Sequence, residues 1–218
     1  MKLIKKEKEP SEWETYRNTP GVKYESKPYL RKALYKEQGG ICAYCMQRLK
    51  NEFEIDKPST NRIEHLKSRD NYPELQLDYR NMLLCCNGQA KEGKNDHVYC
   101  DRKKGNKEIT ISPLDSNFIE SLSYHYKSGK IVSSYTNWQK ELDDVLNLND
   151  SLLKENRAYT FKGIYKILNS KGWKVSEFKS LINKYNVRNS KGLYEPFCEM
   201  IVWFLNKKLE AHHKQVST

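Results

Sequence analysis

Cysteine is concentrated in one stretch of this 218-residue chain. Five of the six cysteines lie between residues 42 and 100, and two of the five histidines, His65 and His97, lie in the same stretch. The N-terminal sequence MKLIKKEKEPSEW lacks the apolar core of a secretory signal, so we expect a cytoplasmic protein. In the cytoplasm, clustered thiols are metal ligands more often than disulfides. We therefore expect the chain to fold around a metal site.

The cysteine spacing favours structural zinc, which takes four tetrahedral ligands. Cys42 and Cys45 form a Cys-x-x-Cys knuckle that can supply two of them. For the other two we favour Cys86 and Cys100, which would join the ends of the polar loop between them. His97 paired with Cys100 has the same spacing as a knuckle and is an alternative, as is Cys85. A redox role for Cys-x-x-Cys would require a βαβ context, which the sequence does not show.

The charge of the chain points to a polyanionic partner. The net charge is +11 with a pI near 9.2, and both halves are basic. Nucleic acid is the simplest such partner, although a well solvated, lysine-rich surface would give the same balance. The mean hydropathy is −0.90, and no apolar run approaches the roughly 20 residues needed to span a bilayer. The sequence thus predicts no membrane association.

Hydrophobic periodicity predicts an α+β fold for the first half of the chain. We expect helices at residues 11–16 and 27–38, the second ended by Gly39-Gly40. Short strands are expected at 46–49 and 62–66, followed by a helical turn over 78–84. The run NGQAKEGKND, residues 87–96, is polar and typical of a loop.

The second half is predicted to be mainly helical. A hairpin is expected around Lys127–Lys130, and the segments Asn149–Ser151 and Val175–Ser176 offer helix N-caps. The helical patterns cover residues 138–146, 151–168, 176–185 and 194–212. Cys198 lies in the last of them and is expected to be a buried core residue. We predict one region over 1–110, with the N-terminal arm and the zinc site, and a second over 111–218.

The order of the motifs resembles that of the HNH, or ββα-metal, endonucleases. After the Cys42–Cys45 knuckle come Glu64-His65, then Asn81, then Cys100-Asp101-Arg102-Lys103-Lys104. That family combines a zinc knuckle, a His preceded by an acidic residue or His, a central Asn and a second cysteine element ending in Lys. The runs IEHLKSR, YPELQLDYRNMLLCCNG and CDRKKGN are further similar to the PtuB nuclease subunits of Septu-type and retron-linked anti-phage systems. The resemblance covers about residues 41 to 106.

The resemblance implies a role for each matching residue. His65 would be the general base that activates water, while Glu64 and Asp101 would hold one catalytic Mg²⁺ or Mn²⁺. Many HNH nucleases carry Asn or His at the position of Asp101. Asn81 would orient the segment around His65. The residues expected to face the nucleic acid, whether DNA or RNA, are Arg102, Lys103 and Lys104.

The resemblance also implies a fold and a partner. Residues 1–110 would be the HNH endonuclease domain, a zinc-containing ββα-metal core preceded by an N-terminal helix. The helical region 111–218 would offer a docking surface to an ATPase subunit of the PtuA type, with retron components as further partners. The rival hypothesis is a non-catalytic zinc module that binds nucleic acid or protein. In that case Glu64, His65 and Asp101 would have no reason to converge.

Overall fold

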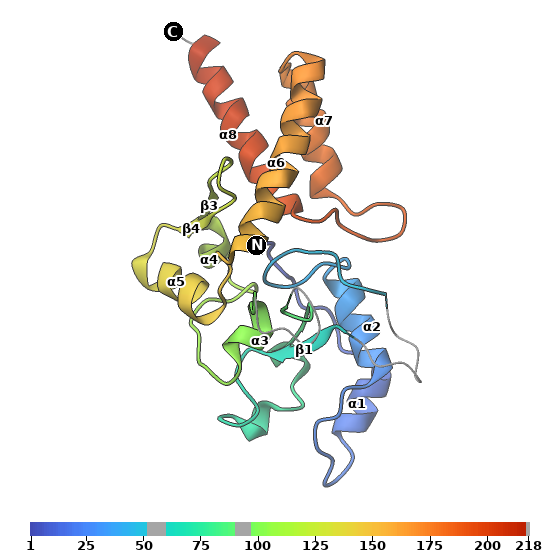
Figure 1. Cartoon of the computed structure of the whole chain (residues 1–218). Coiled ribbons are helices and arrows are strands. Elements are labelled where there is room, and N and C mark those ends of the chain that lie inside the picture. The colour runs from blue at the N-terminus through green and yellow to red at the C-terminus, as the bar shows by residue number, and fades with distance from the viewer. Residues whose placement is uncertain (52–59, 90–96, 217–218) are drawn as a thin grey trace.

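The computed structural model describes residues 1–51, 60–89 and 97–216. It has a mixed α/β architecture, in which two small antiparallel sheets lie among helices (Figure 1). The first sheet and the helices α1 (Ser11–Arg17), α2 (Pro28–Glu37) and α3 (Cys100–Lys104) form the lower part of the view (Figure 1). The helices α6 (Ser151–Lys171), α7 (Val175–Asn186) and α8 (Cys198–Val216) extend from it. No helix in the described ranges combines the length and apolar composition that crossing a membrane requires.

The N-terminal helices form where the periodicity predicts them. Helix α1 is Ser11–Arg17 and buries Trp13, and α2 is Pro28–Glu37 and buries Leu30 and Leu34. Gly39 follows with a φ of +61°, and a Cβ there would lie 2.4 Å from the Tyr194 ring. The glycine therefore both ends α2 and allows the close approach of a distant segment.

The central sheet differs from the prediction. Strand β1, Arg62–His65, is confirmed, and it pairs antiparallel with β2, Met82–Cys85. The helical turn predicted over 78–84 is wrong beyond one 3₁₀ turn, Tyr79–Asn81. All four residues of β2 are buried, so the strand lacks the alternation that identifies a half-buried strand. The strand predicted at 46–49 is also wrong, because only an isolated bridge, Ile41 to Arg48, forms there.

A short helix completes this unit. Helix α3, Cys100–Lys104, follows β1 and β2 in the chain, which gives a strand, strand, helix order. The predicted order was the same, but of its elements only the strand at 62–66 is observed, and the other strand and the helix lie at other residues. Most of the predicted loop over 87–96 lies outside the described residues.

The second half is largely as predicted. The hairpin is confirmed as β3, Leu122–Tyr124, paired with β4, Ile131–Ser133. The remaining elements are α4 (Ser116–Glu120), α5 (Thr136–Lys140), a π-helical turn (Glu141–Val145), α6 (Ser151–Lys171), α7 (Val175–Asn186) and α8 (Cys198–Val216). Asp150 caps α6 by accepting a hydrogen bond from the Leu152 amide, as expected. For α7 the N-cap is Lys174 without a side-chain bond, so the predicted cap is wrong.

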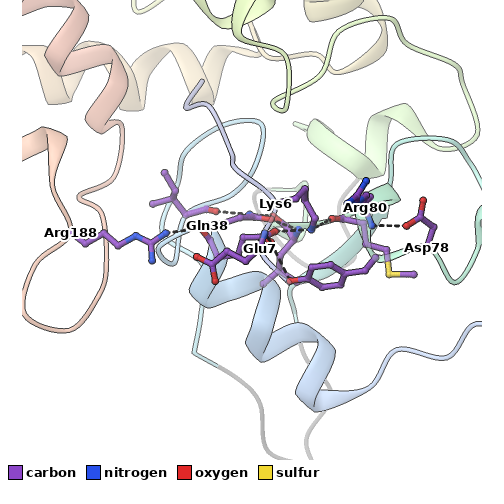
Figure 2. Close-up of polar contacts among 11 residues, drawn as sticks. Lys6, Glu7, Gln38, Asp78, Arg80 and Arg188 are labelled. Carbon is purple, nitrogen blue, oxygen red and sulfur yellow. Dashed lines mark hydrogen bonds and ion pairs between the residues drawn. The ribbon is translucent and has the colours of Figure 1, made fainter. Parts of the chain in front are cut away.

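The first residues of the chain connect the two halves. The Ile4 amide donates to the Pro113 carbonyl at 2.8 Å, and Lys2 pairs with Glu199 of α8 at 3.0 Å. Farther along, the Lys6 ammonium lies 2.7 Å from a Glu37 carboxylate oxygen and 3.0 Å from the Met82 carbonyl. Figure 2 shows Lys6 and Glu7 of this segment close to Gln38. The segment therefore contacts α8 at one end, and α2 and β2 at the other.

Candidate metal centre and active site

Four thiols gather at one point of the structure. Cys42 and Cys45 come from the turn after α2, Cys86 follows β2 directly, and Cys100 begins α3. Their sulfur atoms all lie within 4.8 Å of one another, with Cys42 to Cys100 at 3.9 Å and Cys45 to Cys86 at 3.7 Å. Four converging thiols could hold a metal ion such as zinc. This is the set that the spacing favoured.

Backbone hydrogen bonds shape the turn that carries the first two cysteines. The Cys42 amide donates to the Gln47 carbonyl, and the Met46 amide donates back to the Cys42 carbonyl. Met46 itself has a φ of +60°, which closes the turn so that both thiols point inward. On the opposite side, the Cys100 amide donates to the Leu146 carbonyl at 2.8 Å. The second half of the chain thus helps to position a ligand of the metal centre.

The alternative ligands, His97 and Cys85, are not members of the four-thiol set, although the Cys85 thiol neighbours that of Cys42. The Nδ1 atom of His97 lies 2.9 Å from a carboxylate oxygen of Asp150, the N-cap of α6. Cys85 is buried on β2 and is not a member of the four-thiol set. Among the described residues, no other group of three or more His, Cys, Asp or Glu side chains converges in this way.

The thiols influence one another's ionisation. Burial acts to raise the pKa of Cys42, but hydrogen bonds from the surrounding cysteines, Cys100 first, bring it well below its ordinary value. Burial and the hydrogen bond to Cys42 raise the pKa of Cys100. The neighbouring thiols therefore favour a thiolate within the set, and thiolate is the form that binds a metal.

Glu64 lies at the centre of a buried polar cluster. Its Oε1 atom accepts a hydrogen bond from the Tyr44 hydroxyl at 2.8 Å and lies 2.9 Å from the Lys104 ammonium. Its carboxyl group also hydrogen-bonds to Asp101, which forms an ion pair with Arg62. The structure thus brings together the two acidic residues that the sequence singled out.

The two carboxylates respond differently to their surroundings. Burial, followed by the adjacent Asp101, raises the pKa of Glu64 well above its ordinary value. Burial also acts to raise the pKa of Asp101, but hydrogen bonds with Glu64 and Arg62 outweigh it and lower that pKa. Negative charge is therefore favoured more on Asp101 than on Glu64. Two adjacent carboxylates suit a hard divalent cation.

His65 occupies the other side of the strand, as the alternation of β1 requires. Its Nε2 atom lies 3.0 Å from the Gln76 carbonyl oxygen, and its ring packs edge-on against Tyr24, with the centroids 4.6 Å apart. Burial, opposed by the bond to Gln76, lowers the pKa of His65 to about 4. The imidazole is therefore neutral at physiological pH.

Asn81 holds the chain that follows His65. Its side-chain oxygen accepts a hydrogen bond from the Lys67 amide at 2.8 Å, and its nitrogen donates to the carbonyls of Lys67 and Leu75. Its own carbonyl accepts from the Leu66 amide. These contacts are of the kind expected of a residue that orients the His65 segment.

The three basic residues of α3 do not share one environment. Arg102 and Lys103 are exposed, and Arg102 donates to Asn87 at 3.2 Å. Lys104 is 1% exposed and donates to the His65 carbonyl as well as pairing with Glu64. Lys104 therefore does not share the exposed setting of Arg102 and Lys103, because the helix turns it toward the carboxylates.

Two members of the polar cluster were missed by the sequence reasoning. Tyr44 stands between the knuckle cysteines, and Arg62 lies two residues before Glu64 on the same strand. The i, i+2 spacing puts Arg62 and Glu64 on one face of β1, and this signal could have identified Arg62. Nothing in the sequence distinguishes Tyr44 from the other tyrosines of the chain.

Comparison with known proteins gives one informative match. No family model matches the chain. The chain is 29% identical over 128 residues to the Septu protein PtuB of Bacillus thuringiensis. This similarity supports a PtuB-like relationship. The matched segment is 56% of this chain and 42% of PtuB, so the match covers less than half the length of that relative. The resemblance to PtuB drawn from the sequence motifs is thereby confirmed.

Proposed function

We propose that this chain is a metal-dependent endonuclease of a Septu-like anti-phage system. The observation that supports the proposal is the buried cluster in which Glu64 of β1 lies beside Asp101 and Lys104 of α3, with His65 next to Glu64 in the chain but on the other side of the strand. A hydrolase of this type needs a metal-binding pair and a base close together. Similarity to PtuB supports the biological setting, and the motif resemblance to HNH nucleases supports the chemistry.

Glu64 and Asp101 are the residues that would hold a catalytic Mg²⁺ or Mn²⁺. Such an ion polarises the scissile phosphate and stabilises the charge on the leaving oxygen. Lys104 and Arg62 already contact the two carboxylates and keep them in place. Zinc in the four-cysteine set would be structural, since all four positions of a tetrahedron are then filled by protein.

His65 would take a proton from the attacking water. Because its Nε2 faces a carbonyl oxygen, which only accepts hydrogen bonds, Nε2 carries the proton of the neutral ring. The lone pair then belongs to Nδ1, which is the atom that we assign as the base. Asn81 would keep the loop after His65, and with it the Gln76 carbonyl, in the position that fixes this tautomer.

The proposed substrate rests on the exposed basic residues, and the proposed partner rests on the similarity to PtuB. Arg102 and Lys103 are exposed beside Asp101, where they would contact the phosphate backbone of DNA or RNA. We assign the helical region 111–218 as the docking surface for an ATPase of the PtuA type. This assignment rests on the similarity to PtuB.

The proposal is tested by cleavage assays with purified chain, alone and with its ATPase partner. Duplex DNA, single-stranded DNA and structured RNA would be incubated with Mg²⁺ or Mn²⁺. Removing a general base costs about 10² to 10⁴ in rate, so His65→Ala should leave the substrates intact on a gel. His125→Ala is the matched control, because His125 is exposed and lies outside the site.

Two results would decide the matter. Cleavage by the parent and by His125→Ala, with loss in His65→Ala at unchanged zinc content, supports the nuclease. If the parent cleaves no substrate even with the partner, the proposal fails and a zinc-stabilised binding module becomes the better account.

A further inference from the structure

A cavity with an unusual polar lining lies beside the metal centre. It has a volume of about 470 Å³ and is bordered by Cys86, by α6 and by the segment before β1. Its lining includes five side-chain amides, those of Gln47, Asn61, Asn87, Gln89 and Asn156. Lys50 and Arg48 contribute positive charge, and no carboxylate is among the described residues that line it. We call it the amide-lined cavity.

Two of the amides have no partner within the described parts of the chain. Asn61 donates to the Lys50 carbonyl, and Asn87 accepts from Arg102. The side chain of Gln89, by contrast, is only 9% exposed and makes no hydrogen bond to a described residue, and the side-chain amide of Asn156 makes none either. Gln89 is buried and Asn156 is half-buried, and water or a ligand can satisfy the two amides.

An aromatic side chain stands at the same cavity. Tyr159 is 79% exposed, and no ring contact or hydrogen bond of its side chain to a described residue is found. Asn156 and Tyr159 are three residues apart on α6 and therefore share one face of the helix. A free aromatic ring next to unpartnered amides is the combination that proteins use to stack and read an unpaired base.

The cavity adjoins the proposed catalytic cluster. Asn61, in its wall, immediately precedes Arg62, which pairs with Asp101. Asn87, also in the wall, accepts from Arg102, the residue after Asp101. Two residues of the cavity wall are therefore next to, or hydrogen-bonded to, residues that flank the proposed catalytic cluster.

We propose that the amide-lined cavity binds an unstacked base of a single-stranded nucleic acid. Tyr159 stacks on the base, and the amides of Gln89 and Asn156 bond to its edge. The identity of the strand as substrate rests on the proposed nuclease function, whereas the binding itself does not.

The test measures binding without cleavage. The full chain carrying His65→Ala would be titrated into a labelled single-stranded oligonucleotide of mixed sequence and followed by fluorescence anisotropy. Tyr159→Ala is expected to weaken binding by about tenfold or more, as loss of one base stack does. Gln89→Leu should also weaken it. Tyr159→Phe keeps the ring and should bind as the parent does, as should Tyr135→Ala, which alters a tyrosine that is 58% exposed outside the cavity.

A second ligand separates base binding from backbone attraction. An oligonucleotide with abasic sites throughout should bind equally to the parent and to Tyr159→Ala. The proposal is overturned if the parent binds no oligonucleotide, if Tyr159→Ala binds as the parent does, or if the abasic strand suffers the same loss. If base-dependent binding holds but the chain with an intact His65 never cleaves, the nuclease function fails and the base site stands.

Discussion

Lys104 illustrates how the setting of a single residue decides its role. As part of the run Arg102-Lys103-Lys104 it looks like one of three phosphate-binding side chains. In the structure its neighbour Lys103 is exposed, whereas Lys104 reaches inward to Glu64 at 2.9 Å. The two lysines differ in burial because they occupy different positions on a five-residue helix. Their residue type is the same.

Substitutions of the two lysines should have different effects on the free energy of unfolding. Lys104→Met removes the positive charge from a buried ion pair, which typically costs about 3 to 5 kcal/mol of stability. Lys103→Met, one residue earlier and exposed, should change the free energy of unfolding by less than about 0.5 kcal/mol. Urea denaturation of both variants checks the expectation. Equal stabilities would contradict the buried pairing of Lys104 with Glu64.

At the level of elements, the metal centre joins three segments that have little else in common. The turn after α2, the end of β2 and the start of α3 each contribute to the four-thiol set. Short elements of this kind are weak on their own, since β1 and β2 have four residues each and α3 has five. A bound ion would hold them at a common point.

Adjacent cysteines provide a matched test of the ligand set. Cys86→Ala should lose the bound zinc, with metal content falling well below one equivalent and a large drop in Tm, because structural zinc contributes about 10 to 16 kcal/mol in small domains. Cys85→Ala should keep its zinc, since the Cys85 thiol is outside the set. Elemental analysis and thermal unfolding give the two readouts. Zinc loss from Cys85→Ala alone would reverse the assignment.

The elements also show what the sequence can and cannot predict. Helices α1, α2 and α6, the strand β1 and the β3–β4 hairpin follow from periodicity and turn residues. Strand β2 does not, because burial on both faces removes its alternation. The four cysteines could be named from their spacing, whereas Tyr44 and Lys104 join the polar cluster through tertiary packing. Tertiary contacts of that kind produce no periodic pattern in the sequence.

On the scale of the whole molecule, the N-terminal segment is joined to α2 and β2 through a buried ion pair. The Glu37 side chain is fully buried and binds the Lys6 ammonium, the Glu7 amide and the Tyr79 hydroxyl. Lys6 in turn donates to the carbonyl of Met82, directly after Asn81. These contacts therefore lead from the N-terminal segment to the neighbour of Asn81, whose side chain hydrogen-bonds to Lys67 and Leu75.

Two glutamates of this region are expected to contribute differently to the free energy of unfolding. Glu37→Gln leaves Lys6 without its counter-charge in a buried setting and should lower the free energy of unfolding by about 3 kcal/mol or more. Glu9→Gln disrupts a pair with Arg17, whose side chain is 38% exposed, and should cost less than about 1 kcal/mol. Chemical denaturation compares them, and a Glu37→Gln variant as stable as Glu9→Gln would refute the coupling.

The contact between Cys100 and Leu146 limits which segments two related proteins can exchange in a chimera. The Cys100 amide donates to Leu146, and the Asn147 side chain donates to the Val98 carbonyl at 2.8 Å. Both hydrogen bonds join the segment that contains the Cys100 thiol to the region after residue 111. A chimera joined near residue 110 would therefore pair a metal-binding half with a foreign surface. Recombinants that inherit residues 97–100 and 146–150 from the same parent should be the ones that survive.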